Sequence, residues 1–157
     1  MNLERTNQTK AAITAVGGYV PDTILSNEDL EKMVDTKDAW ITSRTGIKER
    51  RILKDPNKAT SYLAIKAAQD LISNYQIDPS TIDMVLVATI TPDLPVAATA
   101  AYVASSIGAQ NAFAYDLNAA CSGFLYGMST SAAYINSGSY KKVLLIGADK
   151  MSSIVDY

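Results

Sequence analysis

The residue best placed to do chemistry is Cys121, because it stands between two segments of different predicted structure. Residues 113–117 form a short aromatic and apolar run that predicts a strand, and the small and apolar residues up to Ile135 predict a helix. A cysteine in the first turn of a helix meets unpaired backbone N–H groups and the positive end of the helix dipole. Both stabilise a thiolate, so we predict that Cys121 is a nucleophile. The alternative is a small, buried structural residue, the usual role of a single cysteine in an apolar stretch.

The second candidate site is a tryptophan and an arginine four residues apart. We predict a short helix that starts near Asp35 and Thr36, runs to Arg44 and ends at Gly46. On such a helix Trp40 and Arg44 share one face. An indole beside a guanidinium can bind a planar ring and a phosphate together. The alternative is a structural tryptophan next to a solvated arginine.

The remaining elements predict an α/β fold. Ser26 and Asp29 have the spacing of a capping box that starts a helix, and Thr60 to Tyr75 has the pattern of an amphipathic helix. Strands and helices alternate through most of the chain, which indicates βαβ units and a mainly parallel sheet. The predicted strands are residues 11–16, 84–89, 113–117 and 143–146, with a strand or exposed ribbon at 47–53, and the other predicted helices are 97–107 and 122–136.

Composition narrows the class of function. The chain has 157 residues and a formal net charge of −2, so neither nucleic acid nor an anionic membrane surface is indicated as a partner. We find no signal-peptide core near the start and no apolar run long enough to span a bilayer. One cysteine excludes an internal disulfide and fits a reducing compartment, so we expect a cytoplasmic protein. The sequence contains no histidine, the usual base for a cysteine nucleophile.

Charge is missing from a long stretch of the sequence. Between Asp93 and Lys141 the only charged residue is Asp116, so the two helices predicted there have no charged face. A helix that lies on the surface of a free-standing domain normally has one. We therefore expect another chain or another domain to cover these helices.

Two separate motifs resemble β-ketoacyl-acyl-carrier-protein synthase III, the condensing enzyme that starts bacterial fatty-acid synthesis. They are Tyr-Asp-Leu-Asn-Ala-Ala-Cys-Ser-Gly-Phe at residues 115–124 and Trp-Ile-Thr-Ser-Arg-Thr-Gly-Ile at residues 40–47. Shorter matches stand in the family's order at residues 50–51, 87–89, 91–93 and 147–149. The resemblance runs from about Ala11 to the end of the chain, and agreement between separated motifs is far more specific than one short pattern.

The resemblance implies the thiolase fold, in which two similar βαβαβαββ halves stack as five layers, α/β/α/β/α. Residues 1–157 would form one N-terminal half-domain, and the C-terminal half would be absent from this chain. The central helix that follows the cysteine in this family is covered by both sheets. That cover would account for the charge-free helix.

The resemblance also implies a role for each candidate residue. Cys121 would accept an acetyl or other short acyl group from coenzyme A, and its backbone N–H would form part of an oxyanion hole. Trp40 would stack on the adenine, Thr36 would contact the same ring, and Arg44 would lie at the nucleotide end. Malonyl-acyl-carrier protein would then lose carbon dioxide and attack the acyl-enzyme. No metal and no cofactor besides the acyl-CoA substrate is implied, and the enzyme would be a homodimer.

The sequence departs from the family pattern in three ways. The family's catalytic histidine and asparagine lie in the C-terminal half, and the chain has about half the family's length. An arginine that covers the other face of the adenine would fall near Ser153. Two alternatives therefore stay open: another thiolase-fold acyltransferase, of polyketide or hydroxymethylglutaryl type, and a non-catalytic α/β module with a buried structural cysteine.

Overall fold

The computed structural model describes residues 10–155, which form two compact units. The first unit contains the residues up to Tyr19 together with Ala59–Asp149, and the second contains Val20–Lys58 together with the residues from Lys150 onward. Cys121 belongs to the first unit, and Thr36, Trp40 and Arg44 belong to the second.

A parallel three-stranded sheet forms the centre of the first unit. Its strands are β3 (Met84–Ala88), β4 (Phe113–Leu117) and β5 (Val143–Gly147), in the order β4-β3-β5. Met84 of the central strand is paired with Phe113 on one side and with Val143 on the other. Helix α4 (Thr99–Ile107) connects β3 to β4, and helix α5 (Gly123–Asn136) connects β4 to β5. The predicted alternation of strands and helices is therefore confirmed.

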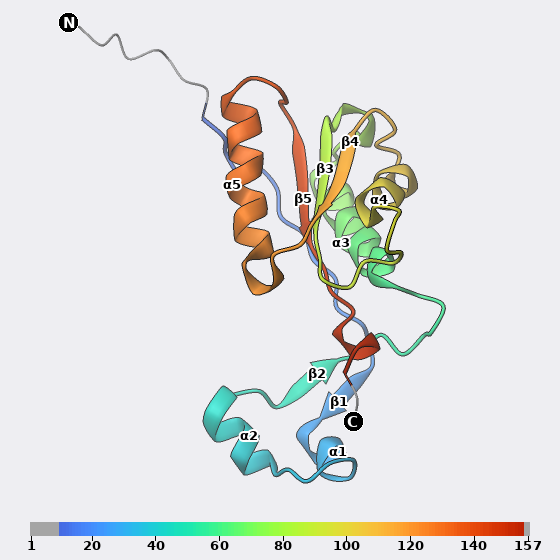
Figure 1. Ribbon diagram of the computed structural model, residues 1–157, viewed down its shortest axis with the longest axis vertical. Coiled ribbons are helices and arrows are strands. Elements are labelled where there is room, and N and C mark those ends of the chain that lie inside the picture. Colours follow the sequence, from blue (N-terminus) through green and yellow to red (C-terminus); the bar gives the residue numbers. More distant parts are fainter. Residues whose placement is uncertain (1–9, 156–157) are drawn as a thin grey trace, which may run out of the picture. The chain divides into compact units, whose positions relative to one another are not determined.

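The two faces of this sheet are covered by different helices. Helix α3 (Thr60–Tyr75) lies with α4 on one face, and α5 lies on the other (Figure 1). All five residues of β3 are buried, which is the reason for its unbroken apolar sequence. Ala64 and Ala68 of α3 are fully buried against this core, as the helical spacing predicts, but Tyr75 is 48% exposed because the helix ends there.

The predicted strand at residues 11–16 is wrong. This described segment forms no strand, and Ile13 and Val16 are exposed. Backbone N–H groups in and beside the segment bond to helix side chains instead of to a neighbouring strand. Ala11 donates to Asn136 Oδ1 at 3.0 Å and Gly18 donates to Asp70 Oδ2 at 3.0 Å. Apolar alternation alone does not make a strand where no ladder partner is provided.

The second unit is smaller and contains a two-stranded antiparallel ribbon. Strand β1 (Ile24–Ser26) pairs with β2 (Glu49–Arg51), and helices α1 (Asn27–Glu31) and α2 (Asp38–Thr45) lie between them in the sequence. Its buried apolar side chains are few, namely Leu30 and Ile41 among the described residues. Polar contacts must therefore hold much of this unit together.

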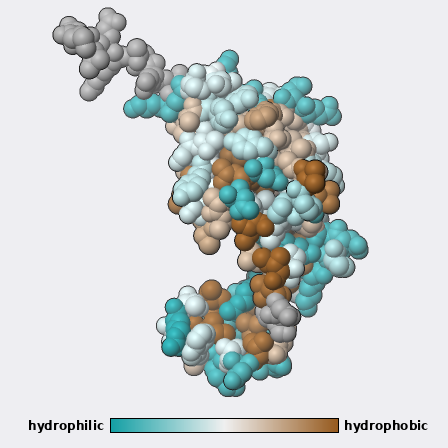
Figure 2. Space-filling model, viewed as in Figure 1, coloured by the Kyte–Doolittle hydropathy of each residue, from teal (hydrophilic) through white to brown (hydrophobic). Residues whose placement is uncertain are grey.

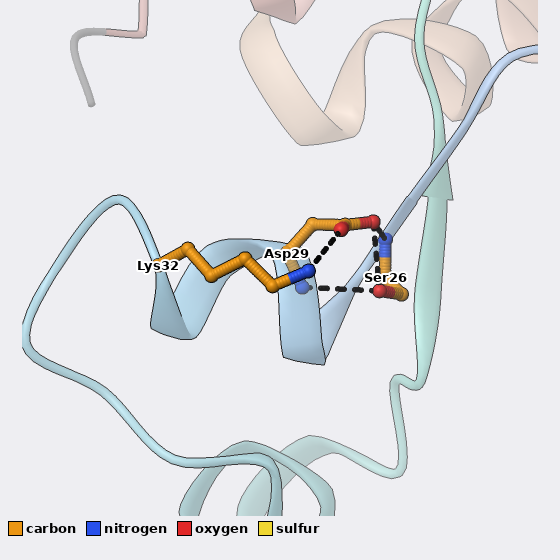
Figure 3. A network of polar contacts seen from close by, with 3 residues as sticks. All are labelled: Ser26, Asp29 and Lys32. Carbon is orange, nitrogen blue, oxygen red and sulfur yellow. Dashed lines mark hydrogen bonds and ion pairs between the residues drawn. The ribbon is translucent and has the colours of Figure 1, made fainter.

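The predicted capping box at the start of α1 is confirmed. Ser26 Oγ accepts from the Asp29 backbone N–H at 3.1 Å, and Asp29 Oδ2 accepts from the Ser26 backbone N–H at 3.2 Å (Figure 3). Lys32 extends the network through an ion pair of 3.1 Å with Asp29. The pKa of Asp29 is lowered, first by the Ser26 hydroxyl and then by Lys32.

Candidate active site

Cys121 lies in a tight turn between β4 and α5, at the carboxyl end of the parallel sheet. A single 3₁₀ turn (Ala120–Ser122) holds it, and α5 begins at Gly123. Cys121 is exposed in this chain, which does not favour the alternative of a buried structural cysteine. Ala120 has a φ of 47°, in the left-handed region that costs a residue with a Cβ about 1–2 kcal/mol. Strain of this kind is typical of sites that must present one side chain.

Two glycines let α5 lie very close to the sheet. A Cβ added at Gly123 would be 3.3 Å from the Ala88 Cβ of β3, and one added at Gly127 would be 2.5 Å from the Leu145 Cδ1 of β5. A side chain at Gly127 would require the Leu145 side chain to move from its position against the helix. The small residues of this helix therefore fix where its first turn lies, and with it the position of Cys121.

Three carboxylates organise the same edge of the sheet. Asp116, at the end of β4, accepts from the Thr99 and Ala100 backbone N–H groups at 2.7 Å each and so caps α4. Asp149, after β5, accepts from the Thr89 hydroxyl at 2.9 Å and from the Ile90 N–H at 2.8 Å. The third, Asp93, accepts from the Ser61 N–H at 2.8 Å at the start of α3.

These bonds have two consequences for the site. Helix α4 starts at Thr99 and not at Ala97 as predicted, because the Asp116 carboxylate binds the backbone at Thr99 and Ala100. All three carboxylates are engaged in holding backbone and hydroxyl groups in place. They therefore act as structural groups in this chain, and Cys121 remains the candidate nucleophile of this edge.

A shallow hollow lies at this edge of the first unit. Its walls are the proline-containing loop after β3 and the end of β4, and its lining residues are Thr89, Pro92, residues 94–98, Asp116 and Asn118. Asn118 is three residues before Cys121 in the chain. No sequence pattern predicted this proline-containing loop as part of a site.

Trp40 and Arg44 lie on one face of helix α2, as their spacing predicts. The Arg44 guanidinium carbon lies 4.6 Å from the centroid of the Trp40 ring, so the cation stacks on the indole. Trp40 is 55% exposed, so its ring is accessible to solvent. Thr36 lies two residues before the start of the helix and is half-buried. The helix begins at Asp38, later than predicted, and ends at Gly46, whose φ is 72°.

Other kinds of site find no support in the described residues. No group of three or more histidine, cysteine or acidic residues between positions 10 and 155 could hold a metal ion. Within the same range, no helix is both long enough and apolar enough to cross a membrane. Ser153, near the predicted position of the missing arginine, lies in the 3₁₀ turn Met151–Ser153 and donates to the Lys150 carbonyl at 2.7 Å.

Comparison with known proteins identifies relatives over nearly the whole chain. Residues 115–157 match the family model of 3-oxoacyl-[acyl-carrier-protein (ACP)] synthase III. The chain is 60% identical, over 148 residues, to the beta-ketoacyl-[acyl-carrier-protein] synthase III of Chlorobium chlorochromatii (strain CaD3). The matched region covers 94% of this chain and 45% of that relative. The chain therefore spans about half the length of the curated relatives it matches.

Solved structures give the same result for the fold. The 3-oxoacyl-[acyl-carrier-protein] synthase III of Aquifex aeolicus VF5 matches with a TM-score of 0.86 at 44% identity, covering 90% of this chain and 46% of that one. The priming beta-ketosynthase of the R1128 polyketide pathway matches with a TM-score of 0.85 at 32% identity, covering 90% and 42%. The predicted relationship to synthase III and the thiolase-like α/β fold are confirmed.

Proposed function

We propose that this chain, a relative of β-ketoacyl-acyl-carrier-protein synthase III over nearly its whole length, is the nucleophile-bearing half of such an acyltransferase. It would serve the first condensation of fatty-acid synthesis. The observation that carries the proposal is the exposed Cys121, presented by a strained turn directly before α5. Its sequence setting matches the synthase III family model.

The first step of the proposed reaction is acyl transfer to Cys121. The thiolate attacks the thioester carbonyl of acyl-CoA, and the tetrahedral intermediate places its negative oxygen near the Cys121 backbone N–H. Collapse of the intermediate breaks the bond to the coenzyme A sulfur and releases coenzyme A as a thiolate, which takes up a proton. The product is a thioester between the acyl group and Cys121. The acyl-CoA is a substrate, and no step requires a metal or another cofactor.

The second step is a decarboxylative condensation. Malonyl-acyl-carrier protein loses carbon dioxide, and the resulting carbanion attacks the carbonyl of the acyl-enzyme. The bond to Cys121 Sγ breaks, which restores the thiolate and releases 3-oxoacyl-acyl-carrier protein. This chain contains no histidine to stabilise the charge that develops. We therefore propose that the C-terminal half of the same fold supplies the histidine and asparagine for this step.

Substrate binding is the proposed role of the second unit. The exposed Trp40 ring, stacked with Arg44, offers a planar surface and a cation. These two groups suit the adenine and the phosphates of coenzyme A, and Thr36 would add a polar contact to the ring.

The surface of α5 supports the proposed partners. Phe124, Leu125 and Tyr126 are 47%, 64% and 57% exposed, and hydrophobic residues reach the surface of the first unit in Figure 2. We propose that the C-terminal half and a second subunit cover this uncharged helix in a homodimer. We also propose a cytoplasmic location, since a free nucleophilic thiol requires a reducing compartment.

The alternative acyltransferases are less well supported. The R1128 priming ketosynthase shares the fold at 32% identity, whereas the synthase III of Chlorobium chlorochromatii is 60% identical to this chain. A fold hosts many reactions, so the site residues and the higher identity favour the fatty-acid enzyme.

Incubation with acetyl-CoA tests the proposal. We expect the purified chain to gain the mass of one acetyl group, and peptide mapping to place it on Cys121. Cys121→Ala should lose the adduct, and the matched variant Ser122→Ala, which removes the neighbouring hydroxyl, should keep it. Absence of the adduct from the parent chain, or its presence in Cys121→Ala, would contradict the proposed nucleophile.

A further inference from the structure

One buried amide connects the separate pieces of the second unit. Asn27, the first residue of α1, is only 2% exposed. Its Nδ2 donates to Asp38 Oδ1 at 2.7 Å and to the Ile47 carbonyl at 2.8 Å, and its Oδ1 accepts from Arg50. The amide therefore uses both of its donors and its acceptor on groups from three other segments.

Two of these contacts lie at opposite ends of α2. Asp38 is the first residue of the helix, and Ile47 follows Gly46, where the helix ends. The backbone N–H of Asn27 also donates to the Lys48 carbonyl, at 3.1 Å. One side chain thus spans the helix from its start to just beyond its end.

Helix α2 is held at its start also by Glu31, whose carboxylate accepts from the Asp38 backbone N–H at 2.7 Å. It has eight residues, its N-cap Lys37 makes no side-chain bond to the helix, and Ile41 is its only buried residue. A helix this short is marginal in water unless tertiary contacts fix it. The Asn27 amide, followed by the Thr42 hydroxyl, lowers the pKa of Asp38, so the contact is to an ionised carboxylate, which strengthens the bond.

We propose that Asn27 is a positioning residue for substrate binding: by bonding both ends of α2 it holds Trp40 and Arg44 in the orientation that binds the nucleotide of an acyl-CoA. This inference rests on the proposed function of α2. Asn27 does not itself touch the stacked pair in the contacts described. It acts through Asp38 and Ile47, which lie on either side of Trp40 and Arg44 in the sequence.

Only an asparagine meets all the requirements at this position. Aspartate has the same shape and keeps an acceptor for Arg50, but it has no N–H to donate and would stand as a second carboxylate beside Asp38. Alanine removes these three bonds and a longer one of 3.4 Å from Nδ2 to Thr42 Oγ1, and it leaves Asp38 and the Ile47 carbonyl without this donor. Asp38 and Ile47 are exposed, so the expected cost is that of the lost bonds themselves.

The sole tryptophan of the sequence provides the readout. Because Trp40 is the only one, its fluorescence reports on α2 alone. Coenzyme A should quench it, and we expect Asn27→Ala to raise the dissociation constant about tenfold, corresponding to about 1.4 kcal/mol. Pantetheine, which lacks the nucleotide, should bind Asn27→Ala and the parent equally. At saturating acetyl-CoA, Cys121 should be acetylated in Asn27→Ala at the same rate as in the parent. Asn57→Ala, an exposed asparagine of the same unit, should change nothing.

A second variant keeps the test decisive if Asn27→Ala does not fold. Asn27→Asp keeps the size of the side chain and its contact with Arg50. The charged neighbours of the new carboxylate are Asp38 and Arg50, and Lys48 contributes a charge that lowers the pKa of Asp38 from further away. Its affinity for coenzyme A should be low at about pH 7 and recover towards about pH 5, because one proton shared by two carboxyls restores a hydrogen bond to Asp38. A general loss of stability would not recover in acid.

The outcomes separate the two claims. If the parent binds coenzyme A and both Asn27 variants bind it equally well, the positioning role is wrong and the proposed function stands. If the variants lose pantetheine as well as coenzyme A, Asn27 has only a general structural role, and the inference also fails. If coenzyme A does not quench the parent, the binding role of α2 fails, and the inference fails with it.

Discussion

The two candidate sites of this chain are held in place by different means. The Cys121 turn is positioned by packing: α5 lies against β3 and β5 through Gly123 and Gly127, and no side chain caps the turn or the helix. The Trp40 helix is positioned by polar side chains, with few buried apolar residues beneath it. The nucleophile therefore rests on the core of its unit, and the binding residues rest on a hydrogen-bond network.

This difference suits the two tasks. A nucleophile must stay within a fraction of an ångström of its working position, and a close-packed core resists displacement. A helix that binds and releases substrates can be held less rigidly. A small unit with few apolar contacts also undergoes local unfolding more readily than the core of a sheet. We therefore expect substitutions in the first unit to affect global stability, and those in the second to affect binding and local order.

The largest effect is expected for Asp116→Ala, which tests whether the first unit depends on packing alone. The substitution leaves the Thr99 and Ala100 N–H groups without their shared acceptor, and we expect a loss of about 1–3 kcal/mol in the free energy of unfolding. Urea denaturation measures it. Asp22→Ala, which removes an exposed carboxylate, is the control and should change stability by less than about 0.5 kcal/mol. An equal effect of the two substitutions would show that the Asp116 bonds add nothing to packing.

A smaller effect is expected for Trp40→Ala, which sharpens the distinction between binding and chemistry. Losing one aromatic stack should weaken coenzyme A binding by about 0.5–1.5 kcal/mol, in addition to the energy of the apolar contact area that is lost. The fold should remain intact. Calorimetry measures the affinity, and circular dichroism measures the fold. The exposed Tyr102 on α4 of the first unit is the matched control, since Tyr102→Ala also removes an exposed ring. Parent affinity in Trp40→Ala would show that α2 is not the binding helix.

The smallest effect is expected for Ser26→Ala, which removes the hydroxyl of the capping box. Loss of a serine N-cap costs about 1 kcal/mol, and hydrogen exchange should increase in residues 24–51 but not in the sheet. The pKa of Asp29 is lowered from its ordinary value of 3.8, so ionised Asp29 stabilises the fold above that value, and this contribution is lost as the pH falls through the lowered pKa. The variant should lose less stability in acid than the parent. An unchanged acid profile would show that Ser26 does not set the pKa of Asp29.

Local sequence signals predicted most of the elements. The capping box at Ser26, the glycine stop at Gly46 and the helix from Thr60 to Tyr75 all depend on residues close together in the chain, and all are confirmed. The strand predicted at residues 11–16 failed because a strand needs a partner, which its own residues do not supply. The polar residues that hold the sites were missed for a similar reason. Asp116 binds α4 from a strand 16 residues away, and Asn27 reaches Ile47 from 20 residues away.

The sequence by itself determined the chemistry that this protein can offer. A thiol at a strand-to-helix turn, and an indole four residues before a guanidinium, are set by local spacing, since helix and strand periods are properties of the backbone. The tertiary structure alone decided which groups hold those residues in place. It exposes Cys121 through a strained Ala120, seats α5 through Gly127 and buries Asn27 among the ends of other elements. Such contacts arise only when distant segments pack, and packing depends on the shapes of both partners, which no single stretch of sequence specifies.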